Sequence, residues 1–181
     1  MDASRLNPDG FYEFRLGHGT VVTREGARMV VVPDAIVQRL VALALAHSDA
    51  SALRSWGAEL GVVAAGAAGH RVEGLTPESA TDVISGALAL AGLGHASIER
   101  WGDLLAVRVE SSLPVEASAY AALLAGLFES MLEAEVACVP VGPENRFVIV
   151  NPSIADLVQS WVREGAVIAD IASRLFAAEG A

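Results

Sequence analysis

Two periods of apolar residues alternate along this chain, and together they predict a mixed α+β architecture. Apolar residues recur about every second position over 97–109, around Gly102-Asp103, a dipeptide typical of tight turns between antiparallel strands. From 115 to 133 they recur every third or fourth position, which predicts an amphipathic helix. Strand patterns return at 136–141 and 147–150. The order strand, strand, helix, strand, strand predicts a small, mainly antiparallel sheet packed with helices.

The first part of the chain adds short strands and further helices. We expect strands over 11–16 and 28–32, and a helix that begins at Pro33. Apolar residues of that helix recur at helical spacing: Ile36, Val37, Leu40, Leu43 and Ala44. In the next helix Gly57 and Gly61 lie about one turn apart. Each glycine costs about 1 kcal/mol relative to alanine, so the pair predicts the close approach of another backbone.

The helix predicted over 115–133 has two distinct faces. Large apolar residues form one of them: Tyr120, Leu123, Leu124, Leu127, Phe128 and Met131. Small residues around Gly126, together with Glu129, form the other. Because small residues let backbones approach closely, we expect Gly126 and Glu129 in a helix–helix contact across a dimer. A solvated, alanine-rich face explains the same pattern equally well.

The last predicted helix carries an apolar pattern of its own. Apolar and small residues recur there in alternating steps of three and four: Val158, Trp161, Gly165, Ile168, Ala172 and Leu175. This is the spacing of a coiled-coil-like seam. Gly165 predicts a break into two shorter helices. Val158, Trp161, Ile168 and Leu175 are therefore candidate dimer or partner contacts, unless the helix packs on its own domain.

A chain of 181 residues is long enough to bury one sizeable core without disulfides or metals. We divide it into a flexible arm at 1–10, a domain over 11–152 and a helical extension of the same domain over 153–181. Apolar runs are interrupted well before the roughly 18 residues that a membrane span needs, so no membrane insertion is expected. The first residues lack the apolar core of a secretion signal, which predicts a cytoplasmic protein.

Twelve arginines, no lysine and a formal net charge of −10 exclude several classes of function. Without lysine, neither a Schiff-base enzyme nor a P-loop nucleotide site can form. The acidic balance repels nucleic-acid phosphates and anionic membranes, so we expect neither as a partner. The only cysteine, Cys138, rules out an internal disulfide and a cysteine-rich zinc site. It is either a small buried hydrophobe or a reactive thiol.

Residues able to do chemistry are scattered without the spacing that a catalytic or metal site needs. The histidines fall at turns or loop edges, and none has a partner at metal-ligand spacing: His18, His47, His70 and His95. The sequence contains no Gly-x-Ser-x-Gly elbow and no dinucleotide fingerprint. Glu129 and Glu133 lie one helical turn apart, but acid–base catalysis would require raised pKa values. We therefore expect no enzyme, no metal and no cofactor.

Four short motifs follow one another between residues 17 and 152. They are Trp56-Gly57-Ala-Glu59-Leu60-Gly61, Leu93-Gly94 before the strand at 97–101, Leu124-Ala-Gly126-Leu127-Phe128, and Glu135-x-x-Cys138-x-x-x-Gly142 before Arg146-Phe147. In this order they resemble the 4-vinyl-reductase-like domain, a module related to the subunits of the TRAPP vesicle-tethering complex. The family commonly carries another cysteine before the last phenylalanine, and some members bind zinc there. This chain has Pro143–Arg146 in that place, so no such zinc site is expected.

The resemblance implies a homodimer and a hydrophobic pocket enclosed by the sheet and its helices. The residues expected to line this pocket are Leu123, Leu127, Phe128, Met131, Trp101, Cys138 and Phe147. An apolar pocket with few polar groups fits a small nonpolar or aromatic ligand. We therefore expect a non-catalytic regulatory module that binds such a ligand and contacts a protein partner. The alternative is a homodimeric scaffold or adaptor with a filled core, which acts only through protein–protein contacts.

Overall fold

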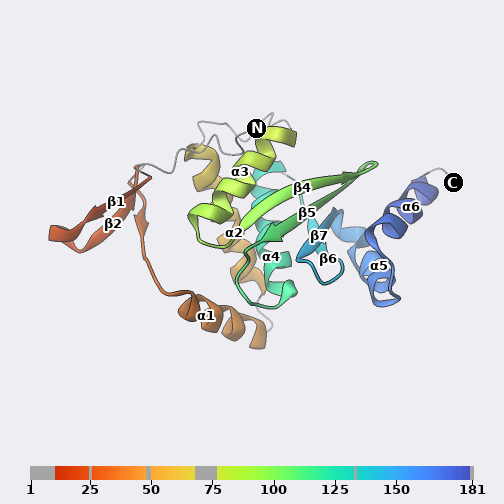
Figure 1. Cartoon of the computed structure of the whole chain (residues 1–181), viewed down its shortest axis with the longest axis horizontal. Helices are drawn as coiled ribbons and strands as arrows, with labels where there is room; N and C mark the ends of the chain where they lie inside the picture. Colours follow the sequence, from red (N-terminus) through yellow and green to blue (C-terminus); the bar gives the residue numbers. More distant parts are fainter. Residues whose placement is uncertain (1–10, 25, 48–49, 68–76, 133, 180–181) are drawn as a thin grey trace.

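The fold combines helices with two separate antiparallel sheets. The computed structural model describes residues 11–24, 26–47, 50–67, 77–132 and 134–179 (Figure 1). Within these ranges the chain forms six α-helices and two antiparallel sheets, one of three strands and one of four. The α+β class predicted from the two apolar periods is therefore confirmed. The arm predicted at 1–10 lies outside the described residues.

The larger sheet is built from two hairpins. Its strands are β4 (His95–Trp101), β5 (Leu104–Glu110), β6 (Ala137–Pro140) and β7 (Arg146–Val150), in the order β4-β5-β7-β6. All neighbouring strands are antiparallel, and Trp101 pairs with Leu104 across the predicted turn. At Gly102 φ is +67°, a left-handed conformation that glycine adopts without strain. Both predicted hairpins are present, with their ends shifted by one or two residues.

Helices α3 (Pro77–Leu90) and α4 (Ala117–Leu132) pack on one face of this sheet, and α2 (Ala50–Ala67) packs against both helices. Side chains from the sheet and from α3 and α4 interdigitate in the main core. The largest of them are fully buried: Ile84, Leu88, Val107, Leu124, Leu127 and Phe147. Val107 of β5 and Phe147 of β7 point into this core, whereas their neighbours Ala106 and Val148 point to the opposite face of the sheet.

The opposite face of the sheet is covered by α5 (Pro152–Arg163) and α6 (Ile168–Glu179). Asn151 caps α5, because its side chain accepts a hydrogen bond from the Ser153 backbone N–H at 2.9 Å. Between the two helices φ at Gly165 is +91°. The predicted break into two shorter helices is therefore confirmed.

The coiled-coil-like spacing of this last segment is used within the chain. Val158 and Ile168 are 0% and 5% exposed in the core cluster between α5, α6 and the sheet. Trp161 and Leu175 are half-buried against the same cluster. The Arg174 guanidinium lies over the Trp161 ring, 5.3 Å from its centroid. The four residues considered for a dimer or partner contact therefore pack on their own sheet, as the other interpretation of the spacing predicts.

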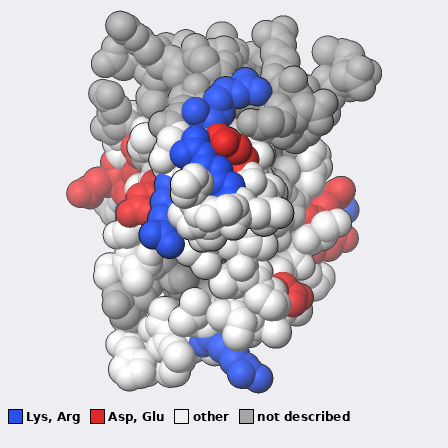
Figure 2. Space-filling view, turned by 90° about the vertical axis from the view of Figure 1, so that its left-hand side faces the viewer, with Lys and Arg blue, Asp and Glu red and all other residues white. Residues whose placement is uncertain are grey.

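The N-terminal part of the chain forms the smaller sheet, which projects from this body (Figure 1). Its strands β1 (Tyr12–Arg15), β2 (Thr20–Thr23) and β3 (Arg28–Met29) pair in that order. Phe11 is buried, and the Tyr12 hydroxyl donates to the Leu90 carbonyl oxygen at 2.6 Å, which ties the sheet to α3. The strand predicted over 28–32 ends at Met29. Figure 2 faces this end of the molecule and shows arginine side chains gathered on it.

Helix α1 (Asp34–Ala46) begins directly after Pro33, as predicted. The face implied by its apolar spacing is wrong, because Ile36, Leu40 and Leu43 are 41%, 60% and 57% exposed. Val41 is the residue of this helix that is fully buried. Apolar side chains of α1 point to most sides of the helix, so their spacing does not identify the side that packs on the rest of the protein.

Candidate ligand-binding site

The α2–α4 crossing holds the site together. A Cβ atom added at Gly57 would lie 1.9 Å from the Leu123 carbonyl oxygen, and one added at Gly126 would lie 1.8 Å from the Arg54 carbonyl oxygen. Only glycine permits such an approach of two backbones. The close contact predicted from Gly57 and Gly61 is therefore confirmed. Gly126, which we expected in a contact across a dimer, lies in this crossing within the chain.

Glu129 also acts within the chain. The Arg54 guanidinium donates to both carboxylate oxygens of Glu129, with 2.6 Å from Nε to Oε2, and donates to the Val136 carbonyl oxygen at 3.0 Å. The Val136 N–H donates back to Glu129 Oε1 at 3.2 Å. The hydrogen bonds from Arg54 hold the pKa of Glu129 below its usual range. Glu129 therefore joins α2, α4 and the start of β6 as an ionised carboxylate. A general acid requires the opposite, a carboxyl group whose pKa is raised.

Most residues expected to line a core pocket are packed against one another instead. They lie between α4 and the sheet, and each is less than 9% exposed: Leu127, Phe128, Met131, Cys138 and Phe147. Cys138 is enclosed in this cluster, and burial raises the pKa of its thiol to about 12. These side chains therefore supply the core rather than the wall of a binding site.

Trp101 lies outside that core and is 36% exposed. It is paired with Leu104, which packs under α5 and α6, and directly paired residues of two strands share a face of the sheet. The indole therefore lies on the face away from α4, where its Nε1 donates to Glu99 at 3.2 Å. The prediction that Trp101 lines the core pocket is therefore wrong, because strand pairing places its side chain on the other face of the sheet.

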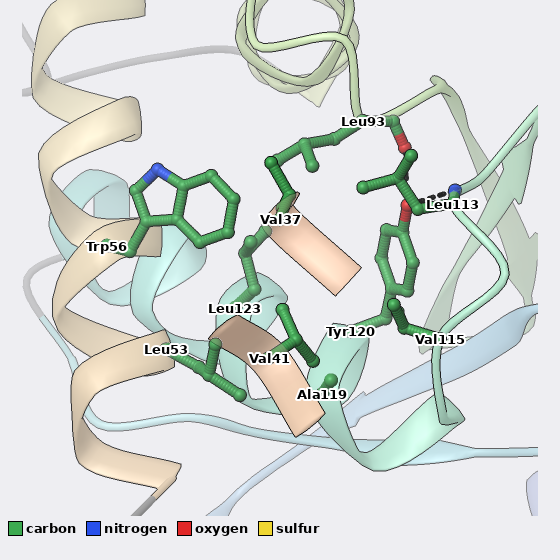
Figure 3. Close-up of a pocket in the computed structure, with 10 residues that line it drawn as sticks. All are labelled: Val37, Val41, Leu53, Trp56, Leu93, Leu113, Val115, Ala119, Tyr120 and Leu123. Atoms are coloured by element: carbon green, nitrogen blue, oxygen red, sulfur yellow. Dashed lines mark hydrogen bonds between the residues drawn. The ribbon is translucent and has the colours of Figure 1, made fainter. Parts of the chain in front are cut away.

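Leu123, the remaining predicted residue, borders a small hollow beneath α1, which we call the α1 pocket (Figure 3). Its volume is about 10 Å³. Ten residues from α1, α2, α4 and two connecting loops line it: Val37, Val41, Leu53, Trp56, Leu93, Leu113, Val115, Ala119, Tyr120 and Leu123. The lining is apolar apart from the phenol of Tyr120 and the indole N–H of Trp56.

The Tyr120 hydroxyl is already engaged by the protein. It accepts a hydrogen bond from the Leu113 N–H at 2.8 Å and donates one to the Leu93 carbonyl oxygen at 2.7 Å (Figure 3). Burial raises the pKa of this phenol. Tyr120 thus ties two loops to α4 and turns the side of its ring to the α1 pocket. A molecule that binds there would be recognised by its apolar surface.

Helix α1 closes the pocket with one face only. Val37 and Val41 line it, while Leu40 and Leu43 are exposed on the other side of the helix. The helix packs against Leu53 of α2 and Ala119 of α4 through this inner face. Leu123 is the residue of this lining that the sequence predicted for a pocket. The spacing of apolar residues in α1 did not predict the site, because it marked the exposed face of the helix as well as the buried one.

Away from the α1 pocket, one contact between polar side chains joins α3 to the larger sheet. The Ser85 hydroxyl lies 2.7 Å from Nδ1 of His95, which joins α3 to β4. In the described ranges no three His, Cys, Asp or Glu side chains lie close enough to hold a metal ion. None of the helices in those ranges combines the length and apolar character needed to cross a bilayer.

No family model matches the chain, and no curated protein matches its sequence.

Proposed function

We propose that this chain is a non-catalytic regulatory module that binds a small hydrophobic molecule in the α1 pocket. The observation that carries the proposal is an apolar hollow shared by α2 and α4 and closed by α1, a helix attached through one face. An apolar lining with a few fixed polar groups is typical of sites for nonpolar or aromatic ligands. The relationship to the 4-vinyl-reductase-like domain is part of the proposal, supported by the hairpin–helix–hairpin order and the glycine crossing.

The mechanism is a shift between two positions of α1. The present pocket, at about 10 Å³, is far smaller than the cavity of about 150 Å³ that is known to hold benzene in an engineered protein. A ligand of that size therefore needs α1 to move away from Leu53 and Ala119. Binding selects the displaced position and so alters the surface that α1 presents to a partner. We further propose a cytoplasmic homodimer that binds neither nucleic acid nor membrane, which the net charge of −10 supports.

Native mass spectrometry of the purified protein, compared with its denatured mass, is the first test. A non-covalent adduct that leaves on denaturation is the expected result, and its mass characterises the ligand. Toluene serves as a probe in a second measurement, methyl NMR of leucine and valine side chains. We expect saturable shifts at Val37, Val41 and Leu123, with Val148 on the far side of the sheet as the unaffected reference.

Two neighbouring substitutions in α1 provide matched variants. Val41→Phe places a ring in the α1 pocket and is expected to abolish the toluene shifts and any adduct. Leu40→Phe adds the same ring on the exposed side of the helix and is expected to preserve both. Absence of an adduct, together with no saturable shift at the three pocket residues, would refute ligand binding.

A second candidate function is a homodimeric scaffold or adaptor that acts only through protein contacts. The observation that favours it is the set of well-packed residues where the core pocket was expected, from Leu127 to Phe147. The same native mass spectrum discriminates the two functions, because a dimer without adduct and without toluene binding is what the scaffold predicts.

A further inference from the structure

A second hollow, larger than the α1 pocket, lies between the smaller sheet and helices α2 and α3. Its volume is about 120 Å³, whereas that of the α1 pocket is about 10 Å³. A cavity of about 150 Å³ is known to hold benzene, so this hollow has room for a somewhat smaller group without movement of a helix. Six residues define it as the N-terminal pocket: Phe11, Tyr12, Met29, Trp56, Glu59 and Leu90. We infer that the N-terminal pocket is a binding site for a small organic cation that carries an alkylated ammonium group.

Small residues at the end of α3 leave this space. The Ala91 N–H donates to the Ala87 carbonyl oxygen at 3.1 Å, so the two alanines lie one helical turn apart, and both line the pocket. The smaller sheet is held beside them, because the Tyr12 hydroxyl donates to the Leu90 carbonyl oxygen at 2.6 Å and Phe11 is buried. Since an alanine side chain ends at its methyl group, the gap between α3 and the sheet stays unfilled.

Aromatic rings supply much of the wall. Phe11 and Tyr12 contact each other edge to face, with ring centroids 4.8 Å apart, and Trp56 of α2 adds an indole. The face of an aromatic ring attracts a cation, and indole is the most effective of the three ring types. Quaternary ammonium groups are recognised in this way by walls of several aromatic rings. The Met29 thioether adds a polarisable surface that adapts to such a group.

Glu59 supplies the charge that an ammonium group needs. It stands within an apolar stripe of α2 formed by Trp56, Leu60 and Val63, all of which line the pocket. Of the described residues in the lining, Glu59 alone is charged. In the part of the chain that the structure describes, no hydrogen bond or ion pair occupies its carboxylate, whereas that of Glu129 is paired. Glu59 is exposed and therefore lies at the mouth of the pocket, where a cation can reach it.

Charge favours a cation over an anion in this pocket. No arginine is among the described residues that line it, although Figure 2 shows arginines at this end of the molecule. Arg15 of β1 is already paired with Glu13 at 2.9 Å. The net charge of −10 raises the concentration of cations near the protein and lowers that of anions. A neutral ligand would leave the Glu59 carboxylate unpaired, whereas an ammonium group pairs with it.

The N-terminal pocket is distinct from the site of the proposed function. Among the described residues, Trp56 is the one that lines both pockets, and the remaining walls are separate. A cation can therefore bind whether or not the α1 pocket accepts a hydrophobic molecule. Variants that test the cation site accordingly leave Trp56 unchanged.

Methyl NMR titrations of the full chain test the site with two matched probes, choline and 3,3-dimethylbutan-1-ol. The alcohol has the shape of choline, with a neutral carbon atom in place of the charged nitrogen. We expect choline to shift Met29, Leu60 and Val63 saturably, with Val148 as the unaffected reference. Choline is expected to bind at least about fivefold more tightly than the alcohol.

Two pairs of variants separate the charge from the space. Glu59→Gln is expected to weaken choline binding about fivefold and to leave the alcohol unchanged, whereas Asp156→Asn removes an equal charge from α5 and changes neither. Ala91→Leu fills the pocket and is expected to abolish binding of both probes. Ala89→Leu adds the same side chain at an exposed position of α3 outside the pocket and preserves binding. Circular dichroism confirms folding, and the Glu59 pair decides the result if Ala91→Leu does not fold.

Several results would overturn the inference. Absence of saturable choline shifts at Met29, Leu60 and Val63 would reject the site. Equal affinity for the alcohol, or equal weakening by the Glu59 and Asp156 substitutions, would reject the cation. Binding that Ala91→Leu leaves intact would place the probes outside the N-terminal pocket. Toluene shifts of the valines that line the α1 pocket are read separately, so failure of the proposed function is distinguished from failure of the cation site.

Discussion

At the scale of single residues, Cys138 shows how burial decides reactivity. The thiol is 8% exposed in the main core, and its pKa is raised to about 12. Because the thiolate is the reactive form, native Cys138 should be inert at neutral pH. We expect a thiol reagent such as dithionitrobenzoate to label it only after unfolding in urea. Rapid stoichiometric labelling of the native protein would instead support the reactive thiol that the sequence left open.

Gly126 is the residue where a single methyl group should matter most. Its backbone touches that of Arg54, and a Cβ atom would lie 1.8 Å from the Arg54 carbonyl oxygen. Gly126→Ala is therefore expected to lower the free energy of unfolding by about 3 kcal/mol, the upper range for overpacked sites. Urea unfolding followed by circular dichroism measures it. Gly17→Ala is the control, because no atom lies within 4 Å of a Cβ there, and an equal loss in both variants would contradict the argument.

The same residues show what spacing reveals and what it leaves open. Gly57 and Gly61 predicted a close backbone approach, because glycine inside a helix needs a compensating contact. Spacing did not say which helix would approach, and Gly126 was assigned to a dimer when its partner is α2. Trp101 was expected to line the pocket that the resemblance implies, whereas its pairing with Leu104 places it on the other face of the sheet.

At the scale of elements, the Arg54–Glu129 ion pair should make the stability of the α2–α4 contact depend on pH. The pKa of Glu129 is lowered in the folded protein by hydrogen bonds from Arg54. The stabilisation is therefore complete above the unfolded pKa of about 4.3 and is lost as pH falls through the lower folded pKa. Glu129→Gln should cost about 1 kcal/mol at neutral pH, a modest value because Arg54 is 42% exposed to water.

The pH dependence of stability tests this assignment. Urea midpoints measured from about pH 6 to about pH 3 should fall less in Glu129→Gln than in the wild type, because the variant has no carboxylate to protonate there. Glu164→Gln removes one member of a more exposed ion pair and is expected to change the neutral-pH midpoint less. Parallel curves for the wild type and Glu129→Gln would show that the pair does not contribute.

Helix α1 is the element in which pattern and packing differ most. Its start next to Pro33 was predicted, because the residues that begin a helix act locally. Its inner face was not, because Ile36, Leu40 and Leu43 share the spacing of a core stripe and yet are exposed. The last segment shows the reverse case: Val158 and Ile168 suggested a partner and are buried on their own sheet.

At the scale of the whole molecule, self-association should appear in thermal stability. If two copies of the chain form the proposed homodimer, the folded dimer is favoured by mass action. The melting temperature of the protein should therefore rise with protein concentration, by a few degrees over the range in which the dimer forms. Differential scanning fluorimetry measures it, and a melting temperature that is independent of concentration would count against the dimer.

The sequence by itself determined the α+β class, both hairpins of the larger sheet, the break at Gly165 and the need for a close approach at Gly57 and Gly61. These features depend on periodicity, turn residues and glycine, which act over a few neighbouring positions. Only the tertiary structure decided that Leu127, Phe128 and Phe147 fill the core and that the hollow lies beneath α1. A hollow depends on how well the volumes of distant segments match, and α1 meets α4 across some 80 residues of chain that no local pattern spans.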